Sequence, residues 1–176
     1  MKRFLVLLQV AVCLLAIPIM AGCSDDPKEP APEPGPVGEL IDATGCKNKD
    51  RSEDPPVLPS DRGYLFWSYN ADTGLLRVEH VNAGLNCCPE YTATITIAGD
   101  QLLITETETE GLCRCLCLYD FAFEVSNLPI GLYEITVDEE YLDPGDPPLE
   151  GVIDLTRAEF GTIQAKRDHY PWEMPE

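Results

Sequence analysis

The stretch Tyr91-Thr92-Ala93-Thr94-Ile95-Thr96-Ile97 alternates threonine with apolar or aromatic side chains. Strict alternation that is rich in β-branched residues predicts a half-buried β-strand, because successive side chains point to opposite faces. The turn residues Ala98-Gly99-Asp100-Gln101 follow, and residues 102–109 have the composition of a second strand. This stretch therefore predicts a β-hairpin and an all-β fold.

The same period-two pattern, punctuated by turn residues, continues from residue 62 to residue 163. Further strands are expected at residues 64–69, 75–81, 112–125, 133–137 and 152–155. Seven or eight short strands at this spacing predict a single immunoglobulin-like antiparallel β-sandwich, with a small β-barrel as the alternative. The turn and strand at residues 127–137 resemble segments of immunoglobulin-like sandwiches on cell surfaces.

The N-terminus has the order of a secretory signal. Lys2 and Arg3 precede a mostly apolar run that ends in small residues before Cys23. A cysteine directly after Ala21-Gly22 resembles a bacterial lipobox, and this resemblance implies cleavage before Cys23 and acylation of that cysteine. A retained membrane helix is the alternative, but the run is short for a span and no positive cluster follows it.

These features divide the chain into four parts. Residues 1–22 are the expected lipoprotein signal peptide, and residues 23–59 are a lipid anchor and proline-rich acidic tether that contains Cys46. Residues 60–172 are the β-sandwich domain, and residues 173–176 are a tail.

Ser24 follows the acylated cysteine, where an aspartate would resemble an inner-membrane retention signal. We therefore expect the protein to be in the outer membrane. Asp25-Asp26 resembles surface-export signals of some lipoproteins, and an ordinary acidic linker is the alternative.

The charge balance is strongly acidic. The chain has 31 acidic and 12 basic side chains, a formal net charge of −19, and loss of the signal removes two of the basic ones. Nucleic-acid partners need a basic footprint, so this balance argues against them. It equally argues against electrostatic docking on an anionic membrane, which leaves the acyl chains at Cys23 as the expected link to the membrane.

Six cysteines remain after the signal and Cys23 are set aside, and they are Cys46, Cys87, Cys88, Cys113, Cys115 and Cys117. An even count in an exported chain predicts disulfides. In a regular strand, Cys113, Cys115 and Cys117 share a face that points to the core. Cysteines two apart on one strand lie at the long limit for a bridge. Each is therefore expected to bond to Cys46, Cys87 or Cys88, which leaves six pairings open.

A metal site is the main alternative for these cysteines. Thiolates together with His80 suit Zn²⁺ or Cu⁺. The C-x-C-x-C spacing, however, differs from the paired C-x₂-C of zinc knuckles. Redox catalysis is a third reading, but the C-x-x-C motif at a helix N-terminus is missing. The sequence therefore favours disulfides and predicts no resident cofactor.

Other candidate residues each have a structural interpretation and a functional one. His80 is expected to be a hydrogen-bonded structural histidine, and Tyr170 and Trp172, beside His169, to pin the chain end onto the sandwich. Trp67 and Trp172 are a speculative sugar-stacking platform. Two acidic groups are candidate calcium ligands, although a solvated strand face or an ordinary loop is favoured. These groups are Glu106, Glu108 and Glu110, and Asp143, Asp146 and Glu150.

Three motifs together resemble a group of uncharacterised bacterial lipoproteins. These are the Cys87-Cys88 pair, the string Cys113-x-Cys-x-Cys-x-Tyr-Asp120, and Tyr170-Pro171-Trp172. The resemblance covers residues 80–172 and implies no activity. The sequence alone predicts a non-enzymatic, lipid-anchored envelope protein with a structural or interaction role and a protein or glycan partner. A small-ligand or metal-binding module is the alternative.

Overall fold

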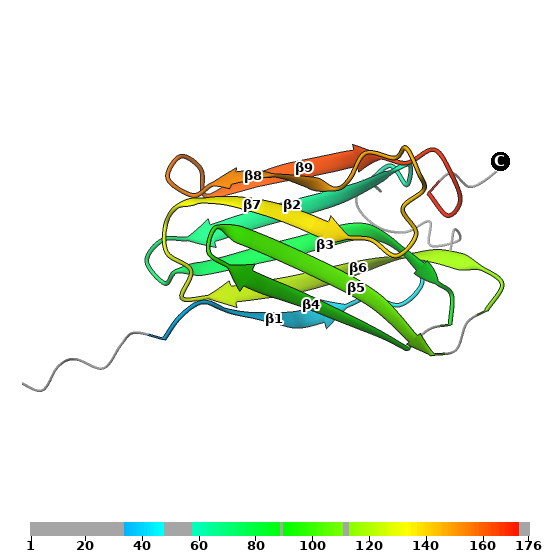
Figure 1. The fold of residues 1–176 in the computed structure, drawn as a ribbon, viewed down its shortest axis with the longest axis horizontal. Helices are drawn as coiled ribbons and strands as arrows, with labels where there is room; N and C mark the ends of the chain where they lie inside the picture. Colours follow the sequence, from blue (N-terminus) through cyan, green and yellow to red (C-terminus); the bar gives the residue numbers. More distant parts are fainter. Residues whose placement is uncertain (1–33, 48–57, 89, 111–112, 173–176) are drawn as a thin grey trace, which may run out of the picture. The chain divides into compact units, whose positions relative to one another are not determined.

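The computed structural model describes residues 34–47, 58–88, 90–110 and 113–172. Within these ranges there is no helix, and nine strands form two sheets (Figure 1). The predicted all-β sandwich is thereby confirmed, and the sheets do not close into the alternative barrel. No helix in the described ranges is long and apolar enough to cross a membrane. The predicted signal, Cys23 and the tail lie outside the described residues.

The larger sheet has five strands in the order β1-β6-β3-β2-β9, and every neighbouring pair in it is antiparallel. Its strands are β1 (Val37–Ala43), β2 (Arg62–Asn70), β3 (Leu75–Asn86), β6 (Leu116–Ser126) and β9 (Phe160–Lys166). The sequence missed β9. It also placed β1 in the tether, and this part of the tether assignment is wrong, because β1 pairs with β6 along its length.

The smaller sheet has four strands in the order β4-β5-β7-β8. Its strands are β4 (Glu90–Ala98), β5 (Gln101–Glu110), β7 (Leu132–Asp138) and β8 (Glu150–Asp154). The hairpin of β4 and β5 turns at Ala98 and Gln101, as the alternating pattern predicts. The sheet is mixed rather than purely antiparallel, because β5 and β7 run parallel.

The core lies between the two sheets and is built from alternate residues of each strand. On β3, Leu76 and Val78 are fully buried, whereas Arg77 and Glu79 between them are exposed. The same alternation buries Phe121, Phe123 and Val125 of β6. Burying such side chains is the main favourable contribution to folding of a sandwich of this kind.

The two sheets meet along the side where β1 and β4 lie next to each other. A Cβ atom on Gly38 of β1 would come within 2.5 Å of the carbonyl oxygen of Ile95 in β4. Only a residue without a side chain allows this approach, so Gly38 closes that side of the sandwich.

Candidate functional site

Three disulfides gather at one end of the sandwich, where β3 ends and β6 begins. The bridges are Cys46–Cys117, Cys87–Cys115 and Cys88–Cys113, with Cα–Cα distances of 5.6, 5.6 and 5.8 Å. These distances are typical of disulfides. The expectation that each cysteine of the C-x-C-x-C string bonds to one of the other three is confirmed, and the structure selects one of the six open pairings.

The expected strand from residue 112 to residue 125 is wrong at its beginning. β6 begins only at Leu116, so Cys117 alone of the three cysteines lies in the strand and is buried. Cys113 is exposed and Cys115 is half-buried, because the irregular segment before β6 turns toward the end of β3. The prediction that all three sulfurs face the core therefore holds only for Cys117.

The metal hypothesis for the cysteine cluster is not supported. It needs thiolates, and the sulfur atoms of all six described cysteines are bonded in pairs. Nor does any group of three or more histidine, cysteine, aspartate or glutamate side chains in the described ranges have the arrangement of a metal site.

Asn86 connects the segment after β3 to the segment before β6. Its side-chain Nδ2 donates to the carbonyl oxygen of Cys113 at 2.8 Å, and its Oδ1 accepts from the backbone nitrogen of Cys113 at 2.8 Å. The backbone nitrogen of Cys87 donates to the carbonyl oxygen of Cys115 at 3.0 Å. The two segments are thus held together by backbone and amide hydrogen bonds as well as by two disulfides.

A buried network of charged side chains lies at the same end, between the sheets. It consists of His80, Glu106, Glu139 and Arg167, with exposed fractions of 0%, 3%, 9% and 0%. The Nδ1 atom of His80 lies 2.6 Å from Oε1 of Glu106, and Nη2 of Arg167 bonds to Oε2 of Glu139. His80 of β3 thus joins the larger sheet to Glu106 of β5, whereas Arg167 directly follows β9 and Glu139 directly follows β7. Charges buried this deeply are costly unless they are paired.

The strand pattern explains how these groups come to be buried. On β5, Glu106 follows Leu102 and Ile104 at intervals of two, so it shares their inward face. On β3, His80 follows Leu76 and Val78 in the same way. The solvated strand face expected for Glu106, Glu108 and Glu110 is therefore wrong for Glu106, which is buried against His80. Glu108 instead accepts hydrogen bonds from the backbone nitrogen of Asn86 and from the hydroxyl of Tyr141. The sequence feature that could have revealed this burial is the position of Glu106 on the same face as Leu102 and Ile104.

The pKa values of the network shift for identifiable reasons. Burial lowers the pKa of His80, but the negative charges of Glu106 and Glu139 and the hydrogen bond to Glu106 outweigh burial and raise it above 6.5. Burial raises the pKa of Glu139 above 4.5, because the charges of His80 and Arg167 only partly compensate for the lost hydration. Both groups therefore hold protons more tightly in the folded protein than in the unfolded chain.

We expect the stability of the domain to fall as the pH is raised from about 6.5 into the alkaline range. The raised pKa of His80 provides stability that is complete below its unfolded value of 6.5 and is lost as the pH rises through its folded pKa. The raised pKa of Glu139 acts in the same direction above 4.5. Urea midpoints measured across this range check the slope. In Glu106→Gln the slope should be smaller, and a wild-type midpoint that stays level or increases would refute the role of the network.

The C-terminal segment covers this end of the sandwich. Trp172 is 1% exposed, and its Nε1 donates to the carbonyl oxygen of Asn82 at 2.8 Å. A Cβ atom on Gly84 would lie 2.4 Å from the indole ring, so this glycine makes room for Trp172. The expectation that the aromatic residues pin the chain end is confirmed. The sugar platform is wrong, because the rings of Trp67 and Trp172 are both buried.

Asn82 is a residue that sequence reasoning passed over. It lies at a bulge of β3 with φ of 65°, and its side chain accepts from Lys47 Nζ at 2.9 Å and donates to the carbonyl oxygen of Arg62 at 2.9 Å. Its backbone nitrogen donates to Asp120, which also pairs with Lys47 at 2.5 Å. Asparagine tolerates this left-handed conformation better than most residues. The bulge therefore fastens several segments to β3.

The loop between β7 and β8 is held by His169. Its Nδ1 lies 3.2 Å from Asp146 and 3.7 Å from Asp143, whereas Glu150 is the first residue of β8. Two of the three acidic residues proposed as calcium ligands thus face a histidine. This contact ties the loop to the C-terminal segment.

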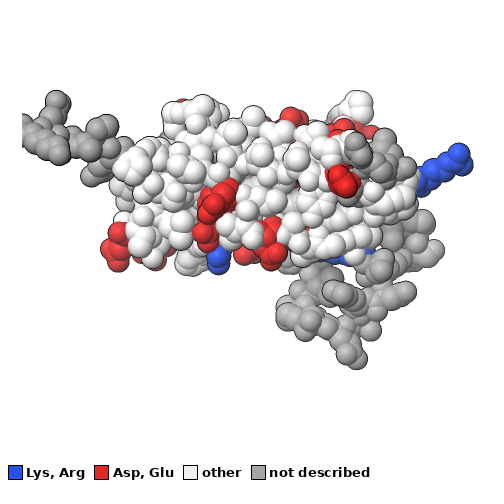
Figure 2. Space-filling model, turned by 90° about the horizontal axis from the view of Figure 1, so that it is seen from below, with Lys and Arg blue, Asp and Glu red and all other residues white. Residues whose placement is uncertain are grey.

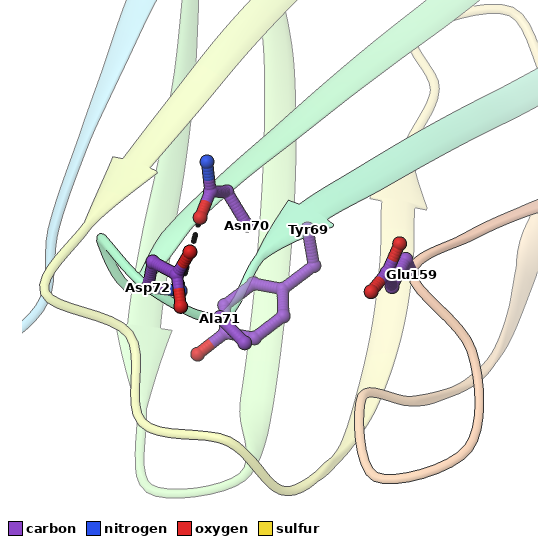
Figure 3. A pocket seen from close by; sticks show the side chains of 5 residues that line it. All are labelled: Tyr69, Asn70, Ala71, Asp72 and Glu159. Atoms are coloured by element: carbon purple, nitrogen blue, oxygen red, sulfur yellow. Dashed lines mark hydrogen bonds between the residues drawn. The ribbon is translucent and has the colours of Figure 1, made fainter.

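An open pocket of about 310 Å³ lies at the turn between β2 and β3. Figure 3 shows the side chains that line it, which are those of Tyr69, Asn70, Ala71, Asp72 and Glu159. The side chain of Asn70 accepts a hydrogen bond from the backbone of Asp72 at 3.0 Å and so holds the turn. None of the predicted site residues lies in it.

Acidic side chains are scattered rather than concentrated on the side where β1 and β4 lie. Figure 2 shows them there as separate groups on a mostly uncharged surface of the described domain. Threonines of β4 are exposed in its outward positions, which are Thr92, Thr94 and Thr96. Scattered negative charge of this kind favours solubility rather than a cation site.

Comparisons with protein families, with curated proteins and with solved structures find no match for this chain. The geometry of this end of the sandwich is therefore the basis for assigning a role. In the described residues, the charged network is enclosed and its groups bond to one another. This arrangement holds chain segments together and presents none of the four groups to a substrate.

Proposed function

We propose that the protein is a lipid-anchored β-sandwich of a bacterial envelope, with a structural or interaction role. The observation that carries the proposal is the pairing of all six described cysteines in disulfides. Disulfides form and persist in oxidising compartments outside the cytoplasm. The secretory signal pattern at residues 1–22 supports the same location.

The anchor is proposed at Cys23. A diacylated or triacylated cysteine binds a bilayer stably, because each buried CH₂ group contributes about 0.8 kcal/mol. Between Cys23 and the start of β1 at Val37 lies a segment with five prolines. An extended segment at about 3.1 Å per residue would hold the sandwich tens of ångströms from the membrane. Ser24 favours the outer membrane, and Asp25-Asp26 resembles surface-export signals of some lipoproteins, with an ordinary acidic linker as the alternative.

The outer face of the smaller sheet supports an interaction role. Leu103 of β5, Leu132 of β7 and Val152 of β8 point outward and are 41%, 56% and 56% exposed. Leu132 and Val152 are diagonal neighbours across β7 and β8, whereas Leu103 lies opposite Thr136. We propose that the Leu132 and Val152 pair is part of a surface for a protein or glycan partner. The acidic balance makes nucleic acid the wrong partner class.

We expect Cys23→Ala to release the protein from membranes without unfolding the sandwich. The variant removes the acylation site and changes no residue of the described domain. Membrane and soluble fractions of the producing bacterium, probed for the protein, measure the effect. Cys13→Ala is the matched control, because it replaces a cysteine inside the signal and should leave the protein anchored. If Cys23→Ala stays in the membrane fraction with its signal uncut, a retained helix replaces the lipid anchor.

A further inference from the structure

The three described disulfides differ in their access to solvent. Both residues of Cys88–Cys113 are exposed, whereas both residues of Cys87–Cys115 are half-buried. Cys117 is 6% exposed, and its partner Cys46 is partly buried against the core. Because an attacking thiolate must reach a sulfur atom, access alone ranks Cys88–Cys113 first for exchange.

The exposed bridge is also duplicated by its neighbour. Cys87–Cys115 joins the same two segments one and two residues away. The amide of Asn86 bonds to both backbone groups of Cys113, each at 2.8 Å. Opening Cys88–Cys113 would therefore leave its two cysteines held near each other.

We propose that Cys88–Cys113 is a reversible thiol-exchange site that accepts two electrons from a dithiol. One thiolate of the dithiol attacks a sulfur of the bridge, forms a mixed disulfide and releases the other cysteine as a thiolate. The second thiol of the dithiol then breaks the mixed disulfide. The products are an oxidised dithiol and two cysteine thiols, and both protons come from the dithiol.

The scaffold makes the reverse step efficient. The Cα atoms of Cys88 and Cys113 lie 5.8 Å apart, within the range that a disulfide spans. Because the remaining contacts keep the two segments paired, closing the bridge is an intramolecular step at high effective concentration. The site can thus open and close while the sandwich stays folded. This inference goes beyond the proposed function and does not depend on the anchor.

The test uses the detergent-solubilised mature protein and dithiothreitol as the dithiol. After brief incubation without denaturant, free thiols are alkylated and located by peptide mass mapping. We expect Cys88 and Cys113 to be labelled together, on the order of tenfold faster than Cys46 and Cys117. Circular dichroism should be unchanged at that point, and removal of dithiothreitol in air should restore the same bridge.

Two double variants separate exchange at this site from general reduction. Cys88→Ser with Cys113→Ser should remove the fast-labelled pair and leave the slow ones unchanged. Asn86→Ala should slow the return of the bridge after reduction, because Cys113 loses two hydrogen bonds. The matched double variant, Cys46→Ser with Cys117→Ser, should keep the fast pair. The proposal is overturned if all six cysteines are labelled at one rate, if labelling appears only with loss of folded signal, or if Cys46 and Cys117 react first.

Discussion

Replacing Arg167 by methionine is expected to lower the free energy of unfolding by about 3–5 kcal/mol. The guanidinium is fully buried, bonds to Glu139, and donates to the carbonyl oxygen of Pro147 at 2.7 Å. It also lies 5.8 Å from the centre of the Trp172 ring. Removing it leaves the buried Glu139 without its partner, and an uncompensated buried charge costs more than a missing contact. Urea denaturation of both proteins measures the loss.

Two further variants show whether the cost comes from the unpaired charge. Arg157→Met removes an arginine whose side chain is 84% exposed and pairs with Asp154, and it should not measurably change stability. Arg167→Met combined with Glu139→Gln should recover part of the loss, because the stranded carboxylate is gone. If the double variant is no more stable than Arg167→Met, the loss arises from the other contacts of Arg167, with Pro147 and Trp172, and the ion pair is not the cause.

The second large effect is expected from loss of the Cys46–Cys117 bridge. This bridge closes the longest loop, with a sequence separation of 71 residues, and fixes the end of β1 to β6. In the chain-entropy model, removing this cross-link gives conformational entropy back to the unfolded chain. For a loop of this length, the free energy of unfolding falls by about 4 kcal/mol. Cys46→Ser with Cys117→Ser should lower the urea midpoint accordingly, measured in the absence of reductant.

The matched control is Cys88→Ser with Cys113→Ser. In this variant Cys87–Cys115 still closes almost the same loop, so little additional freedom is released to the unfolded chain. The loss should be much smaller than for the first pair. Equal losses would show that loop length does not govern the stabilisation in this protein.

Much of the sandwich could be predicted from the sequence because its strands obey the alternation of side chains. In the hairpin at residues 91–109 and in β7, the apolar residues fall on one face of each strand. The turns beside these strands contain glycine, proline or asparagine. The sandwich class follows from the number and spacing of such segments.

The two strands that were missed lack that pattern. β1 carries exposed residues at most positions and follows a proline-rich segment, so nothing local marks it as part of a sheet. β9 begins with Phe160, which is 77% exposed, and buries only Ala165. Both are edge strands of the larger sheet, where pairing with a neighbour rather than burial decides the structure.

The candidate site was predicted only in part. The even number of cysteines in an exported chain predicted disulfides. Which cysteines pair depends on where β6 begins, and residue propensities do not locate the ends of a strand to within a few residues. The network was missed because Glu106 and Arg167 come from distant segments whose approach is a property of the fold. A glutamate in line with Leu102 and Ile104 was the available signal.

The most direct test of an exported, disulfide-linked sandwich is a disulfide map of the protein as it leaves growing cells. Thiols are alkylated at harvest, the protein is denatured without reductant, and cysteine peptides are identified by mass. The account predicts that Cys46 is linked to Cys117 and Cys87 to Cys115, with no free thiol at these four positions. Free thiols there, or a different pairing among them, would contradict it.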